Sequence, residues 1–436
     1  MLLYRLAIQI LRLGLWCAAA LGHRKAKAAW RGRKGWHSRL EQAELNARKN
    51  GRTGPWIHFH CASLGEFEQG APVIRLWRKQ HPEAPILLTF FSPSGIEGVT
   101  ETGADHVDYL PFDTPLSALK FSKALDISDT VFVKYELWPE LMRALHRNNT
   151  RLHLVAARFD VGRHPLNKWG RLIRKHMGLL STLQVQDLQS AQALRTFGFE
   201  AQVTGDPRVD RVFSATQDPI PGPIQERLKR IHEWKERQKL LVIGSAWPAE
   251  WQALRDILDT AHGWVVLWAP HDIDHPDIGH WASHKHTDYL SSWTGHTPGP
   301  GTYKTFDNVP GNPDMLIADE MGLLRFVYGM ADVAVIGGGW GRGVHNVLEP
   351  AAFGIPVLCG PNVTGFREIE ALKQSGGLKV CATADDLAKQ CGLWMESKEA
   401  REEAGQSAAA WVVNQRGSAL RIVSALQSCQ NAEATA

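Results

Sequence analysis

Residues 334–360 read AVIGGGWGRGVHNVLEPAAFGIPVLCG, and this stretch decides the fold class of the chain. The apolar run 333–336 predicts a buried strand, a glycine-rich loop follows it, a helix begins near Asn346, and 356–358 predict the next strand. A strand that returns through a helix to a second strand is the unit from which parallel sheets are built.

Apolar runs of strand length alternate with helix-length segments along nearly the whole chain. We expect strands at 56–60, 86–90, 131–133, 153–157, 183–186 and 202–204, and a second series at 241–244, 264–268, 315–318, 333–336 and 356–358. Between the two series, the proline-rich segment QDPIPGPIQER at 217–227 predicts a linker. The sequence therefore predicts two doubly wound, Rossmann-like α/β domains that face each other across a cleft, at 40–216 and 228–436, with a final helix that can cross back.

Composition narrows the class of protein. The chain has 436 residues, of which 44% are hydrophobic and 22% charged, so it is an ordinary globular protein that is too long for one compact core. A net charge of +4 predicts no nucleic-acid partner for the chain as a whole. The six cysteines are scattered without a CxxC pair, which indicates reduced thiols in a cytosolic setting.

The N-terminal segment, residues 1–39, departs from this average. Its first part, MLLYRLAIQILRLGLWCAAAL, is about one bilayer span long, but Arg5 and Arg12 interrupt it and share one helical face. Residues 23–39 are rich in Arg and Lys and contain no acid. An apolar helix followed by a cationic run suits an anionic cytoplasmic leaflet, so we expect membrane association. The alternative is an ordinary first helix with a solvated basic face.

A lone acid follows the first predicted strand in WIHFHCASLGEFEQG, residues 56–70. Ser63 and Gly65 leave little side-chain bulk around Glu66, and the carboxyl ends of parallel strands are where ligands bind. In the later glycine loop, Gly338, His345 and Asn346 are candidates for contacts with an anion or a sugar, and Glu349 for contacts with ribose hydroxyls. A tight structural turn is the alternative explanation of this loop.

Motifs of other chemistries are missing from the sequence. It contains no HExxH, GxSxG or GxxxxGK[ST] motif. The segment HDIDHPDIGH at 271–280 combines His and Asp, but its proline and irregular spacing favour a solvated loop over a metal site.

Several segments resemble the bacterial 3-deoxy-D-manno-octulosonic acid (Kdo) transferases, which attach Kdo to the lipid A precursor. They are HCASLGE (60–66), YLPFD (109–113), YELWPEL (135–141), VTGDPRVD (203–210) and GVHNVLEPAAFGIPVLCGP (343–361). The resemblance implies a glycosyltransferase fold of the GT-B type, with the acceptor in the first domain and the donor, CMP-Kdo, in the second. It also implies inverting transfer to the lipid A precursor at the cytoplasmic face of the inner membrane, without a cofactor or a metal ion.

The resemblance assigns roles to residues of the first domain. Glu66 aligns with the family's catalytic acid and would take the proton from the acceptor hydroxyl, although it could instead only cap the next helix. Lys134 stands where the family has an acid, and it could pair with Glu66 or hold a substrate carboxylate or phosphate. Arg208 replaces a family lysine and could neutralise the leaving CMP. For both cations an ion pair within the fold is the alternative, and Glu136 retains the second acid of its motif.

In the second domain the resemblance implies a set of CMP contacts, in which Glu349 binds the ribose. The set is Pro270, His271, Met321, Gly322, Leu323, Asn346, Val347, Leu348 and Glu349, with Gly338 and His345 in support. Pro270 stands where the family has an arginine.

Two rival functions share parts of this pattern. A transferase that uses UDP-N-acetylglucosamine would share the glycine loop and Glu349 but not the segment around Glu66. A non-enzymatic nucleotide sensor at the membrane surface would bind CMP without turnover and would not need Glu66.

Overall fold

The computed structural model describes residues 1–99, 101–258, 261–283, 287–291, 313–341 and 343–434. The chain divides into two compact units, one made of Met1–Arg211 and Arg416–Ala436 and the other of Val212–Gln415. The boundary at 211/212 lies within helix α10 (Pro207–Ala215), and the segment 217–227 belongs to the second unit, where α11 begins at Gly222.

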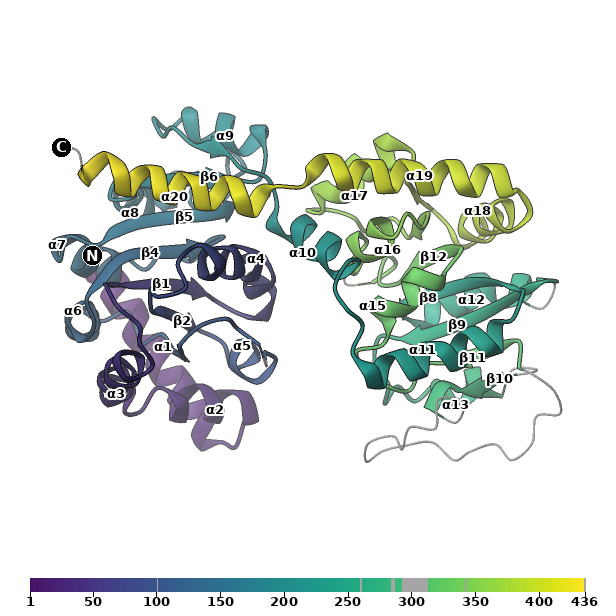
Figure 1. Cartoon of the computed structure of the whole chain (residues 1–436), viewed down its shortest axis with the longest axis horizontal. Helices are drawn as coiled ribbons and strands as arrows, with labels where there is room; N and C mark the ends of the chain where they lie inside the picture. The colour runs from purple at the N-terminus through teal and green to yellow at the C-terminus, as the bar shows by residue number, and fades with distance from the viewer. Residues whose placement is uncertain (100, 259–260, 284–286, 292–312, 342, 435–436) are drawn as a thin grey trace. The chain divides into compact units, whose positions relative to one another are not determined.

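The first unit is a parallel sheet of seven strands with helices on both faces (Figure 1). The strand order is β3-β2-β1-β4-β5-β6-β7, and this order reverses direction between β1 and β4, as in doubly wound folds. Its elements are α1 (Leu2–Ala20), α2 (Arg24–Gly32), α3 (Trp36–Lys49), β1 (Trp56–Cys61), α4 (Leu64–Gln80), β2 (Ile86–Phe90), α5 (Pro93–Glu97), β3 (His106–Tyr109), α6 (Pro115–Ala124), β4 (Ile127–Val133), α7 (Pro139–Arg147), β5 (Arg151–Ala157), η1 (Lys168–Gly170), α8 (Arg171–Met177), β6 (Thr182–Val185), α9 (Leu188–Arg195), β7 (Gln202–Val203) and α20 (Ser418–Ala434).

The second unit repeats this architecture with a second parallel sheet of seven strands. The order is β10-β11-β9-β8-β12-β13-β14, so the reversal falls between β8 and β12. Its elements are α11 (Gly222–Lys235), β8 (Lys239–Ala246), α12 (Pro248–Leu258), β9 (Trp264–Pro270), α13 (Ile278–Ala282), β10 (Thr287–Tyr289), β11 (Met315–Ile317), α15 (Leu324–Val327), η2 (Tyr328–Met330), β12 (Val333–Ile336), α16 (Leu348–Ala352), β13 (Val357–Cys359), α17 (Arg367–Ser375), β14 (Leu378–Val380), α18 (Ala384–Glu396) and α19 (Lys398–Gln415).

The predicted parallel strands are confirmed, with bounds that differ by up to four residues. Three strands, β3, β10 and β14, were not expected from the sequence. Each lies at or beside a sheet edge and has only three or four residues, so it lacks the long apolar run that marks a central strand. Central strands such as β1 are buried at every position, because helices cover both faces of the sheet.

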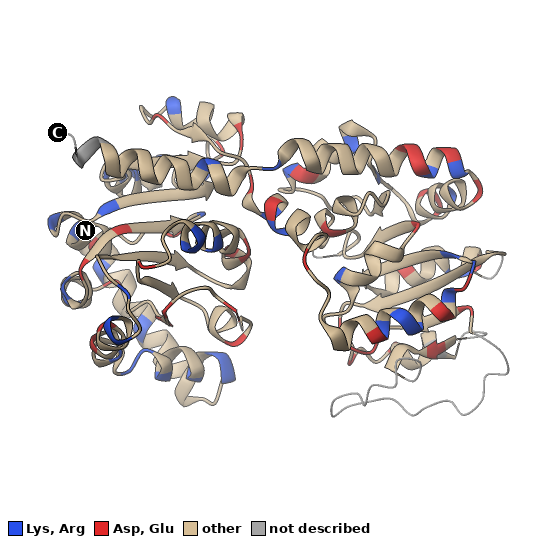
Figure 2. Ribbon diagram, viewed as in Figure 1, with Lys and Arg blue, Asp and Glu red and all other residues tan. Residues whose placement is uncertain are grey.

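Helix α1 lies against the first unit along one face. The Tyr4 hydroxyl donates a hydrogen bond to Asp113 Oδ2 (2.6 Å), and Arg5 Nε donates to Glu140 Oε1 (2.7 Å). The opposite face carries exposed apolar side chains, among them Leu2, Leu3, Leu6, Ile10, Leu13 and Trp16. Among the described residues, α1 is the helix whose length and composition would allow it to cross a membrane. The helix that follows it, α2, is rich in Arg and Lys, whose positions are blue on the ribbon of Figure 2.

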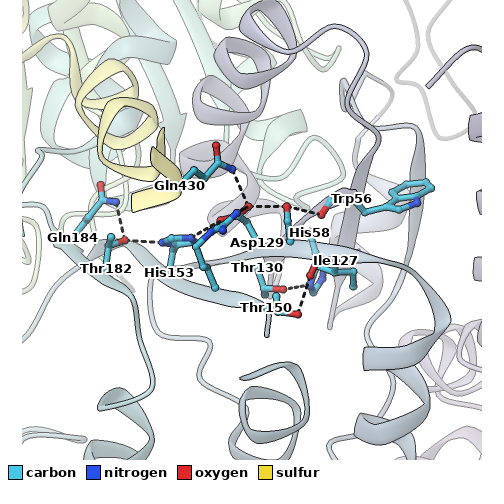
Figure 3. Close-up of polar contacts among 12 residues, drawn as sticks. Trp56, His58, Ile127, Asp129, Thr130, Thr150, His153, Thr182, Gln184 and Gln430 are labelled. Carbon is cyan, nitrogen blue, oxygen red and sulfur yellow. Dashed lines mark hydrogen bonds and ion pairs between the residues drawn. The ribbon is translucent and has the colours of Figure 1, made fainter. Parts of the chain in front are cut away.

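The C-terminal helix α20 packs on the first sheet, where its Gln430 reaches a buried carboxylate (Figures 1 and 3). Gln430 Nε2 donates to Asp129 Oδ2 (2.9 Å), and Asp129 also accepts hydrogen bonds from Arg151 and His153. Burial alone would raise the pKa of Asp129, but the hydrogen bonds from His153 and Arg151 outweigh it and hold the pKa well below its usual value. This ionic network binds a helix from the end of the chain to strands β4 and β5.

Candidate active site

The first candidate site lies at the carboxyl ends of β1 and β4, where the strand order of the first sheet reverses. In doubly wound sheets, ligands bind outside the carboxyl ends of the strands at such a reversal point. Ser63 is the N-cap residue of α4, and Glu66 lies in the first turn of that helix. Lys134 is the first residue after β4. The fold thus brings together two side chains that are 68 residues apart.

The Glu66 carboxylate is partly accessible, with 18% of its side chain exposed. One oxygen accepts a hydrogen bond from the Ser63 hydroxyl, and the other lies 3.5 Å from the Lys134 ammonium. A carboxylate can accept about four hydrogen bonds, so these contacts leave room for a substrate hydroxyl. A methyl group at Gly65 would come no nearer than 3.8 Å to another group, so the turn itself is uncrowded.

Lys134 has an uncommon backbone conformation. Its φ angle is 73°, in the left-handed region, which costs a residue other than glycine roughly 1–2 kcal/mol. Its amide nevertheless donates to the Val155 carbonyl (2.9 Å), which fixes the chain at this point. Non-glycine residues held in this region concentrate at functional sites. In the structure Lys134 pairs with Glu66, which is one of the two roles expected for it.

A chain of buried hydrogen bonds lies behind this site. The Trp138 indole N–H donates to His60 Nε2 (3.1 Å), so the proton of His60 is on Nδ1, which lies 2.9 Å from the Thr89 hydroxyl. Thr89 in turn lies 2.8 Å from His58 Nε2, and His58 Nδ1 lies 3.3 Å from the Thr130 hydroxyl. Burial, with the nearby His60, holds the pKa of His58 well below its usual value. The imidazole of His58 is therefore neutral, and both histidines lie buried within the sheet.

Glu136 and Arg208 complete the sequence-predicted residues of the first unit. Glu136 lies 3.7 Å from His60 Nε2 and remains partly exposed. Arg208 forms an ion pair with Asp206, with a shortest distance of 2.6 Å, which is the internal pairing considered as its alternative role. One turn later in α10, Arg211 pairs with Glu68 of α4 (2.9 Å). Arg208 is therefore on a helix that contacts the helix of Glu66.

The second candidate site lies at the reversal point of the second sheet and has a stack of three rings. Trp247 follows β8, His271 follows β9, and His345 lies in the loop after β12. The ring centroids of Trp247 and His271 are 4.6 Å apart, and those of His271 and His345 are 4.4 Å apart. Burial, together with His271, lowers the pKa of His345. The predicted residues His271 and His345 are thus in contact.

A buried acid holds the glycine loop beside this stack. Glu250 accepts hydrogen bonds from the amides of Gly338 (3.0 Å) and Trp247 (2.8 Å). Burial raises the pKa of Glu250 despite these hydrogen bonds. Other glycines of the loop are required by packing, since a Cβ on Gly337 would lie 2.2 Å from the Ser245 carbonyl oxygen. Packing against neighbouring backbone therefore accounts for part of the glycine pattern.

The remaining donor-side residues surround this loop. Asn346 Nδ2 donates to Glu349 Oε1 (3.0 Å), while Asn346 Oδ1 accepts from the Leu348 amide (3.0 Å). The side chains of Val347 and Leu348 are buried, so a ligand could meet only their backbone. The helix after the loop begins at Leu348, two residues later than expected.

A second loop, after β11, carries the other predicted contacts. Met321 is 75% exposed, Gly322 has a φ of 88°, and Leu323 is buried. Pro270 is the last residue of β9 and is also buried. Among the residues that the structure describes, no three His, Cys, Asp or Glu side chains gather as metal ligands, the described part of 271–280 included.

Sequence reasoning missed Trp247 and Glu250. A signal was present, because WPAE at 247–250 and SLGE at 63–66 both place an acid at the third residue of the helix that follows a strand. In the second unit this acid is buried and bonds to backbone amides, whereas Glu66 is partly exposed and bonds to side chains. The two acids occupy equivalent local positions but are available for different tasks.

Comparisons with known proteins show similarity to one group of transferases. Residues 30–211 match the family model described as 3-deoxy-D-manno-octulosonic-acid transferase (kdotransferase), and residues 308–411 match that of glycosyl transferases group 1. The chain is 27% identical to a 3-deoxy-D-manno-octulosonic acid transferase of Haemophilus influenzae over 391 residues, 85% of this chain and 86% of that protein. It is 26% identical to one of Aquifex aeolicus over 368 residues, 81% and 90% of the two chains.

Solved structures agree on the fold. UDP-GlcNAc 2-epimerase from Neisseria meningitidis superposes with a TM-score of 0.61 and 13% identity, covering 86% of this chain and 100% of that one. MurG of Acinetobacter baumannii gives a TM-score of 0.53 and 11% identity, with coverage of 86% and 100%. Together with the two seven-stranded parallel sheets, these likenesses confirm the predicted GT-B type of fold. These matches make the chain a glycosyltransferase that is similar to the 3-deoxy-D-manno-octulosonic acid transferases over most of its length.

Proposed function

We propose that this protein transfers Kdo from CMP-Kdo to the lipid A precursor in lipopolysaccharide biosynthesis, with inversion at the anomeric centre. The first unit binds the acceptor, and the second binds CMP-Kdo through the glycine loop, the loop at 321–323 and Glu349. The names of the relatives support Kdo as the transferred sugar. The partly exposed Glu66 carboxylate at the reversal point of the first sheet is the observation that carries the mechanism.

In this mechanism Glu66 acts as the general base. It removes the proton of the acceptor hydroxyl while that oxygen bonds to the anomeric carbon of Kdo and the bond to CMP breaks, so that the proton ends on Glu66 and the charge on CMP. Lys134 and Ser63 hold the carboxylate in place, and Arg208 neutralises the departing phosphate once it exchanges Asp206 for this ligand. Glu136, beside His60, borders the same region.

We further propose that the enzyme acts at the cytoplasmic face of the inner membrane. The exposed apolar face of α1 enters the leaflet, and the basic residues of α2 contact anionic headgroups. The hydrogen bonds that Tyr4 and Arg5 make with the first unit support a helix that lies along the membrane surface.

The test is product analysis with a variant of the base. Full-length protein is supplied with lipid A precursor and freshly generated CMP-Kdo, or with UDP-sugars, and the product is identified by mass spectrometry. We expect Kdo transfer from CMP-Kdo alone. Glu66→Gln should keep the hydrogen bond to Ser63 but lower kcat by about 10²–10⁴-fold, because an amide cannot accept the proton.

Glu68→Gln is the matched control, since Glu68 lies two residues further along the same helix and pairs with Arg211. Its kcat should stay near that of the wild type. A folded Glu66→Gln protein with wild-type kcat would show that Glu66 is not the base. Transfer from a UDP-sugar would show that the donor is not CMP-Kdo.

A further inference from the structure

A groove in the first unit lies between α1, α2 and the loops that follow β2 and β3. Its volume is about 490 Å³. Small residues keep it open, because Gly14 and Ala18 of α1 face Ala26 and Ala29 of α2 across it. A Cβ added to Gly14 would meet no atom within 4 Å. The rings of Phe91 and Phe112 also line the groove.

A buried cation lines the same groove. Arg33 is only 6% exposed, and its guanidinium donates to the carbonyls of Leu110 (2.9 Å), Ala29 (2.9 Å) and Phe91 (2.6 Å). No carboxylate among the described residues forms an ion pair with it. Burial lowers the pKa of Arg33 to about 10, so it is protonated at neutral pH. The groove therefore combines apolar walls with a positive charge that acts at a distance on Asp108 but forms no ion pair with a carboxylate of the described residues.

The charge around the groove has the same sign. Lys25 and His23 also line it, and Arg24, Lys27 and Arg31 lie on the same short helix. An apolar groove with a cationic border is complementary to an acyl chain attached to a phosphorylated headgroup. The exposed apolar face of α1 continues from the groove wall, so a chain that leaves a bilayer meets apolar surface throughout.

The groove is also connected to the candidate active site of this unit. The amides of Phe91 (3.1 Å) and Ser92 (2.7 Å) both donate to the Ala62 carbonyl, which directly precedes Ser63. The Phe91 ring stacks on Trp138 at a centroid distance of 4.9 Å, and Trp138 donates to His60. A lipid held in the groove would therefore place its headgroup at the end of the sheet that carries Glu66.

We propose that this groove binds one acyl chain of the acceptor, with its phosphorylated sugar near Arg33 and Lys25. This inference rests on the proposed function, whose acceptor is a phosphorylated, acylated disaccharide. The groove makes the acyl chain a recognised part of the substrate and aligns the sugar hydroxyl with the base.

Gly14→Leu tests the proposal, because a leucine at this position extends into the open groove. Ala7→Leu, at an exposed position of the same helix, is the matched control. Transfer is measured with the acylated precursor and with the same disaccharide phosphate after deacylation. We expect Gly14→Leu to raise the KM for the acylated acceptor by roughly tenfold to a hundredfold, because a few methylene groups of the acyl chain lose their contacts with the groove. The KM values for the deacylated acceptor and for CMP-Kdo should not change.

A second measurement does not need turnover. An acceptor with a diazirine in its acyl chain is photolysed with the full-length protein, and the labelled residues are mapped. Labelling at Ala26, Ala29 and 91–93, which lie off the exposed face of α1, is expected in the wild type and in Ala7→Leu and should be lost in Gly14→Leu.

The outcomes separate this inference from the proposed function. Absence of transfer by the wild type would overturn the proposed function, while the labelling pattern would still decide the groove. An unchanged KM for the acylated acceptor, or equal losses for both acceptors, would overturn the acyl site. If Gly14→Leu impaired transfer to both acceptors equally, and only when phospholipid vesicles were present, the groove would bind a bulk membrane lipid instead. If the diazirine labelled residues across a contact between two copies of the chain, the groove would bind the second copy.

Discussion

At the residue scale, the chemistry depends on a pair of charges that two strands bring together. Glu66 and Lys134 follow β1 and β4, which are neighbours in register, with His60 opposite Phe132. The left-handed φ of Lys134 directs the chain away from the strand end at this point. The backbone strain at Lys134 is the cost of placing an ammonium beside the base.

This strain gives a prediction for Lys134→Gly. Glycine adopts the left-handed conformation without a steric penalty, so the variant should unfold at a temperature equal to or above that of the wild type, with a gain of at most about 1 kcal/mol. Its kcat should fall at least tenfold, since the contact with Glu66 is lost. Thermal unfolding and product formation measure the two effects.

Asn149→Gly is the control, because Asn149 also has a positive φ (59°) but lies between α7 and β5, away from Glu66. It should match Lys134→Gly in stability and the wild type in kcat. If Lys134→Gly kept wild-type kcat, Lys134 would have no part in holding the base.

At the element scale, the final helix α20 is fixed to the first unit by a capping acid. Asp210 of α10 accepts hydrogen bonds from the amides of Gly417 (2.6 Å) and Ala419 (2.7 Å), at the start of α20. Gly205 lies close by, and a Cβ there would come within 2.3 Å of the Ser418 hydroxyl oxygen. Together with Gln430 on Asp129, these contacts attach both ends of α20 to the first unit, which carries Glu66.

Asp210→Ala should therefore weaken the attachment of α20. Loss of an N-cap carboxylate costs about 1 kcal/mol, and two amides lose their acceptor here, so we expect a loss of roughly 1–2 kcal/mol in the free energy of unfolding. Urea unfolding measures the loss, and hydrogen exchange should locate it in α20. Asp218→Ala, at an exposed acid that does not cap this helix, should leave both measurements unchanged. Unaltered exchange in α20 of the Asp210 variant would show that the cap contributes nothing.

At the scale of the whole molecule, the N-terminal helices combine two kinds of surface. The apolar face of α1 is exposed, and α2 adds Arg and Lys residues, blue on the ribbon of Figure 2, with no acid in its sequence. The protein as a whole carries a net charge of only +4, so this cationic region is a local feature. A membrane with anionic lipids should therefore bind the protein through this end.

We expect Lys27→Glu combined with Arg31→Glu to weaken binding to anionic vesicles. Each basic group contributes about 1 kcal/mol near such a surface, so loss of two should lower the affinity at least about thirtyfold. Cosedimentation with vesicles of different anionic lipid content measures the change. The paired control, Arg237→Glu with Lys389→Glu, makes the same charge change at exposed positions of the second unit. Equal losses in both pairs would indicate a net-charge effect and exclude a specific membrane face.

The sequence by itself determined the parallel sheets, the acid after the first strand and the glycine loop, because each is a local pattern of a few consecutive residues. Edge strands such as β3 were missed, since short half-exposed segments carry little periodicity. The sequence allowed the pair of Glu66 with Lys134 and the return of the final helix as possibilities, and the tertiary structure decided both. The stack of Trp247 with His271 was found only in the tertiary structure. The partners in these contacts are distant in the chain, and only the order and register of the strands bring such residues within contact distance.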